Sequence, residues 1–142
     1  MRAHQLRFAV ASLLLCLAGR ASAGLFASRL GDPLEQHQRL FAAGKFSEVI
    51  GRLTPEAMQK LRSKDLKRAY LYLAQSHERT GNLEAALGVY QLGVNLYPKD
   101  INLLIGLAHL LHRTALEEQA EPLYQKVLKI HPNNAPAHLG LA

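Results

Sequence analysis

Two short stretches of the chain repeat one pattern, VYQLGVNLYPKD at residues 89–100 and LYQKVLKIHPNN at residues 123–134. Each contains a Tyr-Gln pair, and a proline follows at the seventh position after the glutamine. The same 34-residue interval separates Tyr90 from Tyr124 and Pro98 from Pro132. Because a match at a fixed interval of this size is typical of stacked structural units, the two stretches predict a repeat architecture.

The 34-residue register extends beyond these stretches. Shifting the sequence against itself by this interval aligns small and apolar residues across residues 67–134. The aligned pairs are Ala69 with Leu103, Leu73 with Leu107, Ala74 with Ala108, Gly81 with Ala115, Ala86 with Ala120, and Leu96 with Ile130. The closing Gly-Leu-Ala of residues 140–142 falls on residues 106–108, so the register continues to the last residue given.

Each unit has the pattern of two helices. Within residues 67–80, apolar and small residues recur every three or four positions, which marks one face of a helix. Gly81 can adopt the left-handed conformation that ends a helix, and Asn82 can cap the next one. A second stripe covers residues 83–97, and Pro98 ends the unit because it has no N–H to donate. The sequence therefore predicts an all-α fold.

These units resemble tetratricopeptide repeats. The pattern of that family is a large residue, Leu followed by Gly or Ala, and later Gly, Ala, an aromatic residue, a small residue and Pro. In the first unit these positions hold Tyr70, Leu73, Ala74, Gly81, Ala86, Tyr90, Gly93 and Pro98. In the second unit they hold Leu104, Leu107, Ala108, Ala115, Ala120, Tyr124, Val127 and Pro132. The resemblance implies a right-handed helical-hairpin solenoid of about three repeats.

The register also predicts how the chain is divided. We expect a linker at residues 24–32, a divergent repeat at 33–66, clear repeats at 67–100 and 101–134, and the start of a further repeat at 135–142. The divergent repeat would have helices over residues 34–43 and 46–53, and a longer second half that reaches about Ser63. Ala115 occupies the position of Gly81 and would be strained if its φ is positive. Pro122 should bend or delay its helix.

Residues 1–23 have the pattern of a secretory signal peptide. Two arginines precede an uncharged apolar run at residues 8–19, and Ala21-Ser22-Ala23 fits the small-x-small rule for cleavage before Gly24. The run is shorter than the roughly 20 residues that span a bilayer, so we expect an exported chain, periplasmic or secreted, with no stable membrane span. A mitochondrial presequence is one alternative, because no acidic residue precedes Asp32, and an uncleaved membrane anchor is another.

Removal of the leader would change both the charge and the cysteine content. The whole chain has 17 basic and 11 acidic residues, a formal charge of +6. The leader contains three of the basic residues and none of the acidic ones, which leaves +3. It also contains the single cysteine, Cys16, so the mature chain would have no disulfide, thiol nucleophile or thiolate metal site.

Few residues offer catalytic or metal-binding chemistry. The sequence has no phosphate-binding or nucleophile-elbow glycine motif, so an enzyme is not predicted. His109 and His112 are three positions apart on one expected helix, but no third ligand accompanies them, and neither a metal nor another cofactor is predicted. Residues 60–68 carry five positive charges and one acid without interleaved aromatic residues. They indicate a solvated basic linker-to-helix face, and not a nucleic-acid site.

In the family, the first helix of each unit contributes to a ligand groove. The residues that fall on those positions here are Arg68, Leu71, Gln75, Glu78 and Arg79, then Asn102, Ile105, His109, His112 and Arg113. This mixture of cations, amides and one aliphatic residue per unit suits an extended peptide or protein partner with an acidic element, met by two fixed cations, Arg79 and Arg113. It is not the full basic clamp of the chaperone-binding members.

The resemblance implies a non-catalytic protein–protein interaction module. Two alternatives remain open at this point: an assembly factor that associates end to end with itself or a neighbour, and a helper subunit of an enzyme. The segment after residue 134 is too short for a stable helix alone. It fits a longer repeat protein cut within a unit, or an end whose apolar face recruits another chain, so that self-association through the C-terminal end is a further expectation.

Overall fold

The computed structural model describes residues 31–142, and these form helices and no strand. The helices, all in one compact unit that runs from Leu34 to Ala142, are α2 (Glu35–Ala42), α3 (Phe46–Arg52), α4 (Pro55–Gln59), α5 (Ser63–Arg79), α6 (Leu83–Leu96), α7 (Ile101–Arg113), α8 (Glu117–Ile130) and α9 (Ala135–Gly140). The predicted all-α fold is confirmed. The predicted leader, residues 1–23, lies outside the described residues, and export stays a prediction.

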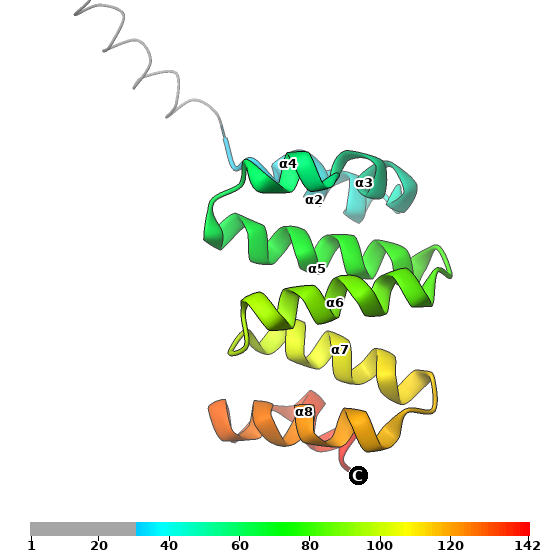
Figure 1. Cartoon of the computed structure of the whole chain (residues 1–142), viewed down its shortest axis with the longest axis vertical. Helices are drawn as coiled ribbons and strands as arrows, with labels where there is room; N and C mark the ends of the chain where they lie inside the picture. Colours follow the sequence, from blue (N-terminus) through cyan, green and yellow to red (C-terminus); the bar gives the residue numbers. More distant parts are fainter. Residues whose placement is uncertain (1–30) are drawn as a thin grey trace, which may run out of the picture. The chain divides into compact units, whose positions relative to one another are not determined.

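The helices from α5 onward stack in pairs. Helix α5 packs against α6 and α7 packs against α8, and Figure 1 shows the four helices side by side in a single row. Helix α7 contacts both members of the preceding pair, and α9 contacts both α7 and α8 in the same way. The first helix after each pair, α7 or α9, therefore packs on both helices of that pair. This arrangement confirms the predicted helical-hairpin solenoid.

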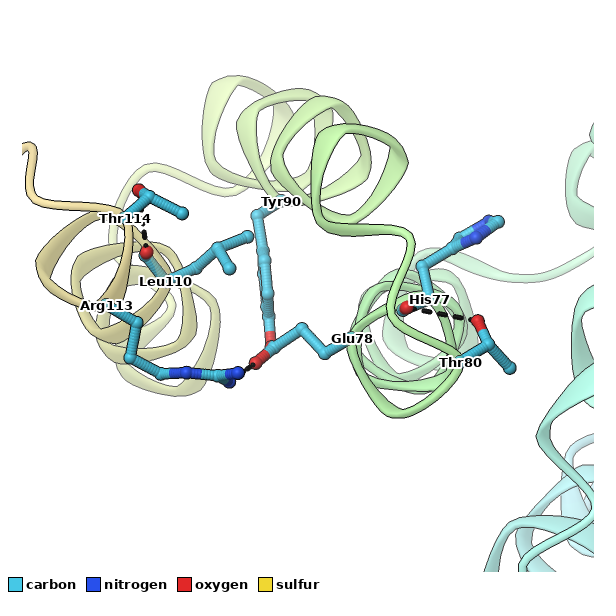
Figure 2. A network of polar contacts seen from close by, with 7 residues as sticks. All are labelled: His77, Glu78, Thr80, Tyr90, Leu110, Arg113 and Thr114. Atoms are coloured by element: carbon cyan, nitrogen blue, oxygen red, sulfur yellow. Dashed lines mark hydrogen bonds and ion pairs between the residues drawn. The ribbon is translucent and has the colours of Figure 1, made fainter.

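The ends of the helices are fixed by the same side-chain contacts in successive units. Asp100 and Asn134, which are equivalent in the 34-residue register, each accept a hydrogen bond from the backbone N–H three positions later, at 3.2 and 3.0 Å. At the C-terminal ends of α5 and α7, the hydroxyl groups of Thr80 and Thr114 donate to backbone carbonyls of the preceding turn (Figure 2). These bonds satisfy N–H and C=O groups that a helix leaves unpaired at its ends.

The turn inside each pair requires a left-handed residue. The φ angles are +73° at Gly44, +80° at Gly81 and +58° at Ala115. Because φ at Ala115 is positive, the strain expected there is present, and the Cβ of alanine destabilises this turn by about 1 kcal/mol relative to glycine. The expected delay at Pro122 is wrong, because α8 begins at Glu117, the position that is equivalent in the register to the start of α6 at Leu83. Proline removes one amide there without moving the helix start.

The divergent repeat differs from expectation after its second helix. Helix α3 ends at Arg52, and a separate short helix, α4, follows instead of a longer second half. The residue before a proline avoids the helical region, and Thr54 is accordingly extended at ψ 158°. Its hydroxyl then accepts a hydrogen bond from the N–H of Ala57 at 3.3 Å and starts α4 with Pro55 in the first turn.

The basic side chains of residues 60–68 are exposed or partly exposed, as expected, and some of them also have a structural role. Helix α5 begins at Ser63, four positions before the predicted start at residue 67, and includes most of the run. Asp65 is buried and pairs with the guanidinium groups of Arg62 at 3.1 Å and Arg68 at 3.9 Å. Lys67 lies 3.5 Å from the carboxylate of Asp100. A buried carboxylate requires such partners, so part of the run stabilises the start of α5.

Neighbouring units are joined by a tyrosine that packs onto a glycine. Tyr90 of α6 and Tyr124 of α8 are among the largest fully buried side chains of the described residues. A Cβ added at Gly106 of α7 would lie 2.6 Å from Cζ of Tyr90, and one added at Gly140 of α9 would overlap the ring of Tyr124. The interval from tyrosine to glycine is the same in both cases, so one contact is made twice in the 34-residue register.

We predict that Gly106→Ala destabilises the fold, because a methyl group at this position must displace a ring that is held in place. Forcing an extra methyl group into a packed site costs about 1–3 kcal/mol. Gly88→Ala on the exposed face of α6 is the matched control: an added Cβ there meets nothing within 4 Å. It should be neutral or stabilising by about 0.5–1 kcal/mol through helix propensity. Urea denaturation measures both, and equal stability of the two variants would contradict the packing assigned to Tyr90.

Candidate peptide-binding groove

A hollow of about 770 Å³ opens along the first helices of successive units. It is lined by Phe41 of α2, Leu71, Gln75, Glu78 and Arg79 of α5, Tyr90 of α6, Asn102, Ile105, Gly106, His109 and Arg113 of α7, and Pro136 of α9. We call this hollow the groove. Its lining residues come from α2, α5, α6, α7 and α9, so the groove is long enough for an extended ligand.

Eight of the ten residues predicted for the ligand surface line this groove. They are Leu71, Gln75, Glu78, Arg79, Asn102, Ile105, His109 and Arg113. Two do not: Arg68 pairs with the buried Asp65 near the start of α5, and His112 is exposed near the end of α7. His109 and His112 therefore face different surroundings, although they are only three positions apart.

A polar network fixes the wall of the groove at the level of Tyr90. The hydroxyl of Tyr90 donates to Oε1 of Glu78 at 2.7 Å, and Nη1 of Arg113 donates to Oε2 of the same carboxylate at 2.9 Å. Figure 2 shows the ring of Tyr90 reaching from α6 to Glu78 of α5, where Arg113 of α7 meets it. Three helices are thus tied by one carboxylate. The bond requires Tyr90 to stay protonated, and burial, followed by the contact with Glu78, raises the pKa of its hydroxyl.

The network gives the two groove arginines different roles, although both were expected to meet a ligand as fixed cations. Arg113 is paired with Glu78, whose side chain is only 16% exposed while that of Arg113 is 57% exposed. Arg79 is exposed, and within residues 31–142 it forms no ion pair. Arg79 is therefore the cation available to a ligand, and Arg113 is first of all a structural partner of Glu78.

The second unit has no counterpart of this network. The residue equivalent to Glu78 in the 34-residue register is His112, so the register brings no carboxylate to Tyr124. The ring of Tyr124 instead lies 5.9 Å from that of His109, centroid to centroid. Burial raises the pKa of the Tyr124 hydroxyl. The carboxylate contact of Tyr90 is therefore replaced at Tyr124 by a contact with an aromatic ring.

An apolar strip runs through the groove beside these polar groups. Leu71 and Ile105, at equivalent positions of the register, supply one aliphatic side chain per unit. Phe41 adds an aromatic end, with its ring centroid 5.2 Å from that of Phe46 and 5.4 Å from that of Tyr72. Phe41 was missed from the sequence, because the divergent repeat leaves the 34-residue register. The signal available for it was an apolar residue near the end of a first helix.

The described residues show no grouping that suits a metal ion. Across residues 31–142, no three histidine, cysteine or acidic side chains gather closely enough to hold one. In the same part of the chain, no helix has the length and apolar character needed to cross a membrane. The groove offers a ligand hydrogen bonds, the charge of Arg79, and aliphatic and aromatic contact.

The stacked pairs define the class of protein, a solenoid of helical hairpins with a groove along its first helices. The family described as "Tetratricopeptide repeat" matches residues 67–110. "Tetratricopeptide repeat protein 8" of Caenorhabditis elegans is 26% identical over 84 residues, which cover 59% of this chain and 17% of that relative. Both matches support the resemblance to tetratricopeptide repeats that the 34-residue register indicates. Repeats of this family generally mediate protein–protein interaction and are typically non-catalytic.

Proposed function

We propose that the groove binds an extended peptide segment of a partner protein and that the protein acts as a non-catalytic interaction module. The observation that carries the proposal is the gathering around one hollow of eight residues that fall on the family's ligand positions. A peptide backbone would meet amide groups from Gln75 and Asn102, and its side chains would lie against Leu71 and Ile105.

The partner segment should carry an acidic residue near Arg79. Arg79 is unpaired within the described residues, while the nearby Arg113 is already neutralised by Glu78. An exposed charge pair contributes about 0.2–1 kcal/mol, so this contact orients the segment more than it holds it. A shallow, mostly polar groove of this kind gives a dissociation constant of order micromolar, which weakens as salt screens the charge.

Arg79→Glu should therefore weaken binding of acidic peptides by roughly two- to tenfold, without a change in melting temperature, because the side chain is exposed. Peptides selected from a random library on the purified chain, titrated by fluorescence anisotropy, measure the effect. Arg52→Glu, an exposed arginine at the end of α3 that does not line the groove, is the control of equal charge change. If every selected peptide binds Arg79→Glu as tightly as it binds the wild type, the groove is not the binding surface.

A second candidate function, association of two copies, is favoured by the exposed apolar residues of the C-terminal end. Leu139 of α9 is 77% exposed and Leu141 is 39% exposed. Among the described residues, α2, α3 and α4 at the other end of the stack present no large apolar side chain of comparable exposure. Head-to-tail association would pair an apolar end with a polar one, so two copies would associate through the same C-terminal end.

Leu139→Glu should accordingly shift any dimer of the purified chain to monomer, because it places two charges in an apolar contact. Gln36→Glu, on the exposed face of α2, tests whether added negative charge alone has this effect. Sedimentation velocity over a hundredfold range of concentration reports the mass. A wild-type chain that stays monomeric throughout that range would exclude self-association through this end.

We further propose that the chain acts after export. The support is the pattern of residues 1–23, a charged start, an apolar run and a small-x-small site. Intact-mass measurement of the protein isolated from its producing cells should then find Gly24 as the first residue. A mass that includes Met1 would contradict export with cleavage.

A further inference from the structure

A second hollow lies at the turn between α6 and α7. It has a volume of about 550 Å³ and shares only Asn102 with the lining of the groove. Its walls are Lys67 of α5 and the turn residues from Leu96 to Ile101. Leu96, in the wall of the hollow, and Leu92, one turn earlier on α6, are 56% and 57% exposed. We call the hollow and these leucines the turn surface.

The exposure of the two leucines is not explained by the packing of the repeat. They are four positions apart and therefore lie together on the helix, in contact with solvent. Their equivalents in the 34-residue register are Lys126 and Ile130, so the second unit presents a lysine where the first presents Leu92. A pair of adjacent exposed leucines beside a hollow is a feature of interaction surfaces.

The charges of the turn surface leave a net positive rim. Asp100, the carboxylate of the hollow, accepts the N–H of Leu103 at 3.2 Å with one oxygen and lies 3.5 Å from Nζ of Lys67 with the other. Lys67 also lies 6.0 Å from the ring centroid of Tyr97. Lys99 is exposed and forms no ion pair with any residue of the described part of the chain. An acidic group at the mouth of the hollow would meet Lys99 without competition.

Comparison with the next unit shows that an equivalent turn forms without lysines at these positions. Lys67, Tyr97, Lys99 and Asp100 fall on Ile101, His131, Asn133 and Asn134 in the 34-residue register. The second turn still ends its helix and caps the next one, since Asn134 accepts the N–H of Ala137 at 3.0 Å. Lys99, which is exposed and has no ion pair in the described residues, is therefore an addition that the turn does not need, whereas Tyr97 packs against the core and Lys67 pairs with Asp100.

We propose that the turn surface is a second docking site, which takes an acidic segment of a partner protein with an apolar side chain beside its carboxylate. The apolar side chain lies against Leu96 and Pro98, and the carboxylate faces Lys99. The site lies outside the groove apart from Asn102, so it is independent of the function proposed above. Surfaces that bind anionic lipid typically gather about four to eight basic residues, whereas two lysines line this hollow, which favours a peptide.

The test sorts peptides selected from a random library on the purified chain by the variants that abolish their binding. One class should carry acidic residues next to an apolar one and lose about tenfold or more of its affinity for the double variant Leu96→Ser, Lys99→Glu. The matched control is Ile130→Ser, Lys129→Glu, which removes one exposed apolar side chain and reverses one lysine in the second unit with the same change of charge. This class should bind the control like the wild type. Leu92→Ser with Lys99→Gln is a second, milder variant in case the first melts at lower temperature.

The result is independent of the groove, because this class should bind Arg79→Glu as it binds the wild type. The proposal is overturned if no selected peptide distinguishes the turn variant from its matched control. It is also overturned if the turn variant loses binding only to phosphatidylglycerol vesicles, since the surface would then be a lipid site.

Discussion

A tyrosine ring packed onto a glycine of the next helix is the contact on which the stack depends. Without a side chain at Gly106, α7 can approach α6 closely enough for the ring of Tyr90 to lie across its backbone, and Gly140 does the same for Tyr124. The contact crosses the boundary between units, so it joins the hairpin of α5 and α6 to that of α7 and α8, and the latter to α9. Each ring is almost fully removed from water, and burying an aromatic side chain of this size is among the larger stabilising terms in a small domain.

The same tyrosine links the stability of the stack to the groove. Because Tyr90 donates to Glu78 and Glu78 binds Arg113, the spacing of α5 and α7 is fixed where a ligand would lie. A groove held open in this way needs little rearrangement on binding, which lowers the entropy that a ligand must overcome. Tyr124 lacks this network, because its ring lies beside that of His109 and the register places no carboxylate next to it.

The parts of this structure that could be predicted from sequence are those whose signals are local or periodic. The caps at Asn82 and Asp100 and the turn at Gly81 follow from residue type. The resemblance to the family indicated most of the residues that surround the groove. The network of Glu78 could not be predicted, because its partners are 12 and 35 residues away and depend on which helix faces meet. Phe41 and α4 were missed for a different reason, since the divergent repeat has lost the interval that carries the signal.

The spacing of the tyrosine–glycine contact has a consequence for how such a chain can change in evolution. Tyr90 meets Gly106 and Tyr124 meets Gly140, so the whole contact recurs with the 34-residue period of the sequence. Duplication or loss of the 34-residue segment between the turns at Gly81 and Ala115 would add or remove one tyrosine together with its glycine partner. The remaining tyrosine–glycine contacts would be preserved. Unequal recombination at these turns can therefore lengthen or shorten the array in whole units while the contact between units is preserved. The length of the groove can then change in evolution without a change in the residues that line each unit.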